Sequence, residues 1–162
     1  SQFLSMAKPD KDKVTETVNV KVVLQSVTDL LHSYGLLHDN RIELNVAGDC
    51  YISANNIEIK QLLINIIKNA IEASKTGDLV LVTAGMKKHF VEIKVIDYGR
   101  GMSEAEVAFL GTPFYSLKSK GTGLGMMICF NIVEKYNGTI DFQTSIGHGT
   151  SVTIRFPSFR LN

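Results

Sequence analysis

The sequence has almost no excess of charge of either sign, since 17 lysine and arginine residues face 16 aspartate and glutamate residues. Proteins that bind nucleic acid through electrostatics usually carry a strong basic excess or a basic patch, so we expect no nucleic-acid partner. The length of 162 residues and the hydrophobic share of 44% suit one domain with a substantial core. Intrinsic disorder is therefore disfavoured.

Cysteine and long apolar runs are also scarce. Cys50 and Cys129 are the two cysteines and have no CxxC spacing, so neither a disulfide framework nor a zinc site is supported. Apolar runs such as residues 22–24 are far too short to cross a bilayer, and no segment of this sequence has the pattern of a signal peptide. We expect the chain to be a cytoplasmic fragment of a longer protein and not to be inserted in a membrane. A membrane anchor elsewhere in that longer protein is compatible with this expectation.

The elements expected from periodicity are helices and strands that interleave. An apolar stub stopped by Pro9 and a charged connector fill residues 1–18, the main domain spans 19–158, and 159–162 form a tail. Helices are predicted over 19–33, 56–74, 103–109 and 123–136, and strands over 41–46, 50–53, 79–84, 90–96, 139–144 and 150–156. This order predicts a two-layer α/β sandwich, with a mixed sheet and helices on one face.

The first predicted helix is capped by Asn19 and is expected to end at Gly35. Its spacing places one apolar face inward. The expected members of that face are Val20, Val23, Leu24, Val27, Leu30, Leu31 and Tyr34.

A first glycine cluster, Asp97 to Gly101, directly follows a predicted strand. Gly99 and Gly101 allow the backbone to turn sharply and to approach a flat ligand closely. The Asp97 carboxylate would accept a hydrogen bond from a donor such as the exocyclic amine of adenine. A glycine-rich turn, in which Asp97 bonds only its own backbone, is the alternative.

A second cluster, Gly121 to Gly125, runs straight into a predicted helix. Backbone amides at a helix N-terminus form an anion site, because the helix dipole lies behind them. No Gly-Lys-Ser/Thr follows, which argues against a Walker loop, and no strand precedes it, which argues against a dinucleotide fingerprint. A third cluster, Gly147 to Thr150, lies between two strands and by itself predicts only a hairpin turn.

A polar stripe lies on the second long helix, where Asn65, Asn69 and Glu72 recur on one side. Asparagine is a mediocre helix former, so two of them four residues apart suggest a specific role. Amide oxygens can coordinate a hard cation such as magnesium together with phosphate oxygens and water. The alternative is an ordinary solvated helix face.

Together these motifs resemble the catalytic, ATP-binding domain of sensor histidine kinases. The N box, first glycine box, F box, second glycine box and terminal glycine box match residues 65–70, 97–101, 113–115, 121–125 and 147–150 in order. The resemblance covers residues 19–158 and implies a Bergerat-type ATP-binding fold, in agreement with the predicted architecture. Residues 112–118 are similar to the nitrogen-regulator and sporulation-kinase branch, and residues 3–9 resemble the end of a dimerisation helix in that branch.

The resemblance also implies residue roles. Asp97 would accept from the adenine amine, Asn69 would coordinate magnesium, and Asn65, Lys68 and Lys118 would act beside the phosphates. Residues 111–122 would form a mobile lid that ATP orders, anchored by Phe114 and Tyr115. The full set implied to contact ATP is Asn65, Asn69, Asp97, Gly99, Gly101, Lys118, Gly121, Thr122, Gly123, Leu124, Gly125 and Thr150.

Two departures from relatives of the fold carry information. Tyr98 follows Asp97 where the family often has asparagine, which leaves any role of that side chain open. Asn65 stands where hydrolysing relatives and serine kinases have a glutamate base, and an amide cannot take a proton usefully at neutral pH. Transfer to a neutral imidazole needs no strong base, so the resemblance favours a histidine acceptor over hydrolysis or serine phosphorylation.

The acceptor histidine is not expected within the chain. The four histidines, His32, His38, His89 and His148, all lack the His-Glu/Asp-x-x-x-Pro pattern of the family. We expect the acceptor on a separate dimerisation domain of the same protein, with a response regulator downstream. The parent protein is expected to be a homodimer and this fragment a monomer.

Overall fold

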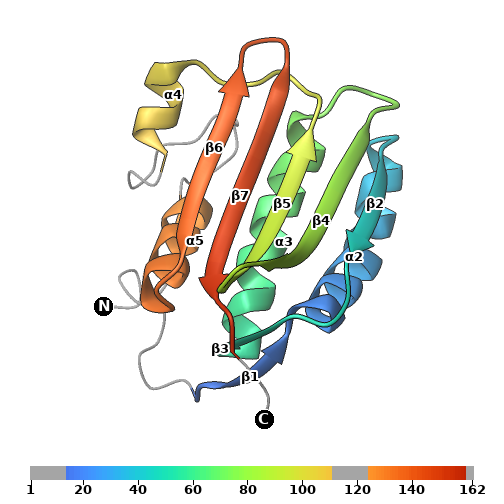
Figure 1. Cartoon of the computed structure of the whole chain (residues 1–162). Coiled ribbons are helices and arrows are strands. Elements are labelled where there is room, and N and C mark those ends of the chain that lie inside the picture. Colours follow the sequence, from blue (N-terminus) through green and yellow to red (C-terminus); the bar gives the residue numbers. More distant parts are fainter. Residues whose placement is uncertain (1–13, 111–123, 160–162) are drawn as a thin grey trace.

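The computed structural model describes residues 14–110 and 124–159 as a mixed five-stranded sheet with helices packed against it (Figure 1). The strand order is β2-β4-β5-β7-β6, in which β2 and β4 run parallel and the other neighbours antiparallel. The bounds are β1 Glu16–Asn19, α2 Val20–Leu37, β2 Arg41–Val46, β3 Tyr51–Ala54, α3 Asn56–Ala73, β4 Leu79–Lys87, β5 Phe90–Asp97, α4 Glu104–Phe109, α5 Leu124–Lys135, β6 Thr139–Ser145 and β7 Gly149–Pro157.

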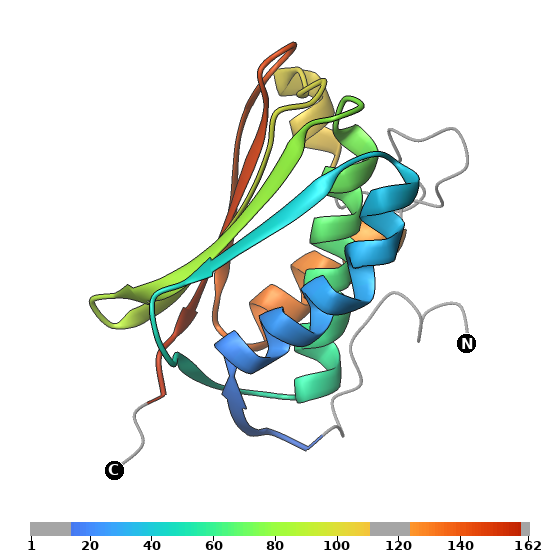
Figure 2. The same ribbon diagram turned by 90° about the vertical axis from the view of Figure 1, so that its right-hand side faces the viewer.

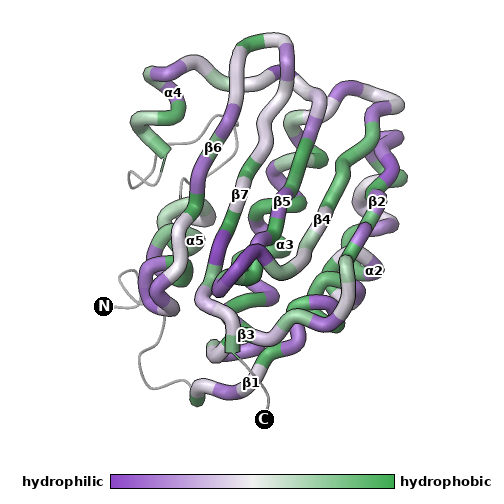
Figure 3. Tube along the Cα trace, viewed as in Figure 1, coloured by the Kyte–Doolittle hydropathy of each residue, from purple (hydrophilic) through white to green (hydrophobic). Residues whose placement is uncertain are grey.

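The helices α2, α3 and α5 cover one face of the sheet, as Figure 2 shows edge-on. Between the two layers lies one apolar core, to which α3 contributes from Ile59 through Ile71 and the sheet contributes alternate residues of β4, β5 and β7. Figure 3 shows the apolar residues concentrated along the central strands β4 and β5, while the edge strand β6 is more hydrophilic. The expected two-layer α/β sandwich with helices on one face is therefore confirmed.

Helix α2 begins where the sequence predicts, but it ends later. The Asn19 side chain caps it by accepting from the Lys21 amide at 3.1 Å. Gly35 does not end the helix, because the chain remains helical to Leu37 and Asp39 takes the left-handed conformation instead. The absence of a side chain at Gly35 allows close packing, since a Cβ there would lie 3.0 Å from the Asn40 carbonyl oxygen.

The expected inner face of α2 is right except at one position. Leu30 is 65% exposed, whereas its neighbour Leu31 is only 6% exposed. The helix meets the sheet near its edge strand β2, and a narrow buried stripe suffices there. Leu30 therefore faces solvent although its spacing fits the inner face.

The region before residue 19 contains a strand that the sequence pattern did not predict. The sequence predicts a connector over residues 16–18, but Glu16–Asn19 form β1, which pairs antiparallel with β3. The side-chain amide of Asn55 donates to the Val14 carbonyl at 2.9 Å. The Glu16 carboxylate accepts from the backbone amide of Asn56 at 3.0 Å. The four-residue strand is too short to show a period, so its pairing partner decides its conformation.

Asn40 ties the start of the sheet to the loop after α3. It is 3% exposed, and its Nδ2 donates to the carbonyl oxygens of Lys75 and Asp78, both at 2.9 Å. We expect Asn40→Ala to lower the free energy of unfolding by about 2 kcal/mol, because two partly buried carbonyls lose their donor. Urea denaturation measures this, with Asn45→Ala on the exposed side of β2 as the control. Equal stability of the two variants would contradict the role of Asn40.

Candidate functional site

The first glycine cluster forms a turn at the end of β5 that is organised by Asp97. This carboxylate is 5% exposed, and its Oδ1 accepts from the backbone amides of Gly99 at 2.9 Å and Thr150 at 3.3 Å. Asp97 is directly opposite Thr150 in the β5–β7 pairing. Within the described residues Oδ2 makes no hydrogen bond, so one fixed acceptor is left over for a ligand.

Burial raises the pKa of Asp97 above the ordinary value of 3.8. The amides of Gly99 and Thr150 and the positive charge of Arg100 oppose this rise, because they stabilise the ionised form. The carboxylate is therefore an acceptor that is held in place and largely removed from water. Such an acceptor can receive a hydrogen bond from a neutral donor such as an aromatic amine.

Three segments distant in the sequence are packed backbone to backbone around this carboxylate. A Cβ on Gly99 would lie 1.9 Å from the Ala73 carbonyl oxygen at the end of α3, and a Cβ on Gly101 would lie 1.9 Å from the Ser145 carbonyl oxygen. A Cβ on Gly149 would lie 2.1 Å from the Asp97 carbonyl oxygen. These contacts leave no room for a side chain, so the glycines are required for the close approach and not only for turning.

The third glycine cluster is therefore part of the site, although by itself it predicted only a hairpin turn. Gly147 donates to the Arg100 carbonyl at 2.7 Å and joins the β6–β7 hairpin to the Asp97 turn. The Thr144 hydroxyl lies 2.8 Å from the Thr150 hydroxyl and accepts from the Met102 amide at 2.9 Å. Thr144 was missed by the sequence analysis, since its role arises from pairing across the hairpin.

Helix α3 brings its polar stripe to the same end of the molecule. The Arg100 amide donates to the Ala73 carbonyl at 3.2 Å, so the Asp97 turn rests on the last turn of α3, one turn beyond Asn69. Asn65 and Asn69 are both half-buried. The structure thus places Asp97, Gly99, Gly101, Thr150 and the end of the asparagine stripe in one region.

Asn65 lies against α5, the helix that follows the second glycine cluster. A Cβ on Gly125 would be within 3.8 Å of the Asn65 amide group, and the Asn65 side chain forms a hydrogen bond with Cys129. Burial raises the pKa of the Cys129 thiol to about 12, so this thiol is neutral at physiological pH. Gly125 and Asn65, expected to share a site, face each other across a gap that a methyl group would fill.

The Lys68 side chain extends toward α2 and not toward α5. It is exposed, and its Nζ lies 5.4 Å from the centroid of the Tyr34 ring on α2. Burial, together with a hydrogen bond from its hydroxyl to Glu72, raises the pKa of Tyr34 to about 12. A phosphate contact of Lys68 remains a prediction, and it requires this side chain to leave the aromatic ring.

The rest of the second glycine cluster lies outside the described residues. This applies to the expected lid over residues 111–122, with Phe114, Tyr115 and Lys118, and to Gly121, Thr122 and Gly123. Leu124 is the first residue of α5.

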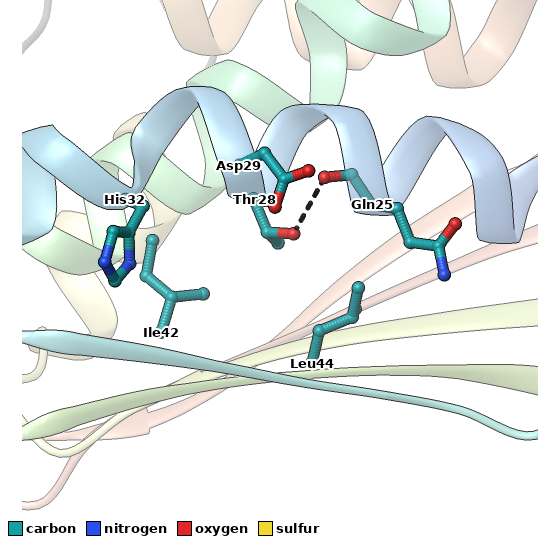
Figure 4. A pocket seen from close by; sticks show the side chains of 6 residues that line it. All are labelled: Gln25, Thr28, Asp29, His32, Ile42 and Leu44. Carbon is teal, nitrogen blue, oxygen red and sulfur yellow. Dashed lines mark hydrogen bonds between the residues drawn. The ribbon is translucent and has the colours of Figure 1, made fainter.

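A cavity of about 440 Å³ lies elsewhere, between α2 and the edge strand β2 (Figure 4). Ile42 and Leu44 form its apolar side, and α2 contributes a polar side. The polar members are Gln25, Thr28, Asp29 and His32. None of the residues predicted to bind ATP lines this cavity.

Comparison with known proteins defines the class of the domain. Residues 54–160 match the family described as histidine kinase-, DNA gyrase B-, and HSP90-like ATPase, and the chain belongs to this family of ATP-binding domains. The catalytic domain of the histidine kinase ThkA, solved free of nucleotide, superposes with a TM-score of 0.80 at 25% identity and covers 89% of this chain and 95% of that one. The five-stranded mixed sheet is thus the sheet of a histidine kinase catalytic domain.

Within the family, the chain is similar to sporulation kinases of Bacillus subtilis (strain 168). It is 36% identical to sporulation kinase A over 97% of this chain and 34% identical to sporulation kinase B over 98% of it. The chain spans only 26% and 37% of the lengths of those two relatives. The expected resemblance to the sporulation-kinase branch of sensor histidine kinases is confirmed.

Proposed function

We propose that this domain binds ATP with magnesium and presents the γ-phosphoryl group to a histidine on the dimerisation domain of a longer, homodimeric sensor kinase. The phosphoryl group would then pass to a response regulator. We place the domain in the cytoplasm, as a monomer when separated from the dimerisation domain. No helix in the described part of the chain is long and apolar enough to cross a membrane.

The arrangement around Asp97 carries the proposal. Its Oδ2 is the acceptor that the backbone does not use, and in the proposed complex it would receive the exocyclic amine of adenine. Gly99, Gly101 and Gly149 permit the close packing of the turn that holds it. Thr150 supports the site through its amide, and its hydroxyl is available to a water or to the base beside the Thr144 hydroxyl.

The donors available for magnesium fit a cation that is mostly bound by phosphate. Within the described residues no three His, Cys, Asp or Glu side chains gather as metal ligands. The Asn69 amide oxygen on α3 would supply a hard, neutral ligand, and phosphate oxygens and water would supply the others. When bound, the cation neutralises charge that develops on the phosphates.

Hydrolysis is the competing activity, and Asn65 argues against it. Its amide forms a hydrogen bond with Cys129, and it offers no carboxylate to take a proton from water. A steady-state ATPase assay on this chain separates the two activities. We expect binding without appreciable turnover, because the neutral acceptor imidazole lies on another domain. Rapid phosphate release would favour the hydrolysing alternative.

We expect Asn69→Ala to weaken ATP binding by about tenfold or more when magnesium is present, because the cation loses a protein ligand. With EDTA in place of magnesium, the variant and the unmodified chain are expected to bind ATP equally weakly. Calorimetry with a non-hydrolysable ATP analogue measures both conditions, with Asn45→Ala as a surface control. An equal loss with and without metal would contradict the ligand role.

A further inference from the structure

Helices α3 and α5 run antiparallel and contact each other along their length. At one end, Asn65 faces Gly125 and forms a hydrogen bond with Cys129. At the other end, Glu58 accepts from Lys135 Nζ at 3.0 Å and from the Tyr136 hydroxyl. The Cys129 thiol, between the two ends, lies 3.9 Å from the Leu62 carbonyl oxygen.

Glu58 is a buried charge, which is unusual on a helix that already has an apolar core face. Its exposed fraction is 0%, and its Oε2 has no hydrogen-bond partner within the described residues. Burial and the Glu58 hydrogen bond both raise the pKa of Tyr136, so its hydroxyl remains a donor at physiological pH. A buried ion pair with one oxygen unsatisfied gives little net stability, but it favours one register of two packed helices over others.

The position of Glu58 relative to the site gives this register a functional consequence. Glu58 and Asn65 are seven residues apart on the same side of α3, which corresponds to about 10 Å along the helix axis. Because α5 is one rigid helix from Leu124 to Lys135, fixing its last turn also fixes its first turn. That first turn contains Gly125, which faces the Asn65 amide with room for one methyl group between them.

We propose that Glu58 is a positioning residue for the phosphate end of the nucleotide site. It holds Lys135 and Tyr136, sets the register of α5 on α3, and thereby fixes the Asn65 amide and the start of α5 where the triphosphate would lie. This inference rests on the proposed function. The adenine end depends on Asp97 and the β6–β7 hairpin, and it lies outside the influence of Glu58.

The test compares MgATP with adenosine, because adenosine uses only the base pocket. In Glu58→Gln we expect the affinity for MgATP to fall at least about tenfold, while the affinity for adenosine stays unchanged. Tyr136→Phe is expected to give a smaller loss of MgATP affinity, again with no change for adenosine, since Lys135 still binds Glu58. Glu92→Gln is the matched control, because Glu92 is a carboxylate of the sheet that pairs with Arg155 at 2.9 Å.

Calorimetry gives the MgATP affinities, NMR titration gives the adenosine affinities, and thermal unfolding verifies that each variant is folded. If Glu58→Gln fails to fold, Tyr136→Phe carries the test alone. MgATP affinity that is unchanged in the folded variants, or an equal loss for MgATP and adenosine, would overturn the proposal. Absence of MgATP binding by the unmodified chain would instead refute the proposed function, so the two failures are distinguishable.

Discussion

Replacing Gly149 with alanine is expected to destabilise the domain by about 3 kcal/mol. Gly149 has a φ of +84°, and a Cβ would lie 2.1 Å from the Asp97 carbonyl oxygen and 2.7 Å from the Tyr98 Cα. These atoms belong to backbone and cannot move aside without opening the Asp97 turn. Urea denaturation measures the loss, and ATP binding is expected to be lost in any folded fraction.

Gly147 provides a matched control in the same hairpin. Its φ is +85°, but a Cβ there would meet nothing within 4 Å. Gly147→Ala is therefore expected to cost only about 1 kcal/mol, which is the penalty for a side chain in the left-handed conformation. Equal losses in the two variants would show that conformation alone matters and that Gly149 does not pack on the Asp97 turn.

Replacing Asp97 with asparagine is expected to lower the affinity for ATP by roughly 10- to 100-fold, with the fold retained. The amide oxygen can still accept from Gly99 and Thr150, but the new NH₂ group would face the adenine amine, donor against donor. The preference for ATP over GTP should shrink. Asp141→Asn, on the exposed edge strand β6, is the control, and calorimetry with both nucleotides measures the effect.

The pH dependence of ATP affinity tests whether the Asp97 carboxylate is the acceptor. Its pKa is raised above the ordinary value, chiefly by burial, so protonation removes the acceptor at a higher pH than for an exposed aspartate. ATP affinity of the unmodified chain should therefore fall as the pH is lowered through that raised pKa. The Asp97→Asn variant should lack this part of the decline, and identical profiles would mean that Asp97 is not the acceptor.

The sequence predicted the layers of the fold because strong periodicity marked the long helices and the central strands. The prediction was wrong where local sequence signals conflict with tertiary contacts. Gly35 resembles a helix terminator, yet it is used for close contact with Asn40. Leu30 fits the apolar spacing of α2, yet it is exposed because α2 lies at the edge of the sheet. Strand β1 forms because β3 is available to pair with it.

The candidate site could be predicted only where its residues are neighbours in the sequence. Asp97 and the first glycine cluster were found because strand, carboxylate and glycines are adjacent in the sequence. The importance of Gly149 and Thr144 arises from the pairing of β6 with β7 and of β7 with β5, which no local pattern reveals. The Glu58 cluster joins residues 77 and 78 positions apart and had no signal in the sequence.

A crystal structure of this chain with magnesium and a non-hydrolysable ATP analogue tests the central claim most directly. We predict that the adenine amine lies within hydrogen-bonding distance of Asp97 Oδ2 and that the cation is bound by phosphate oxygens and the Asn69 amide oxygen. Adenine bound elsewhere, for example in the cavity between α2 and β2 beside His32, would contradict the account.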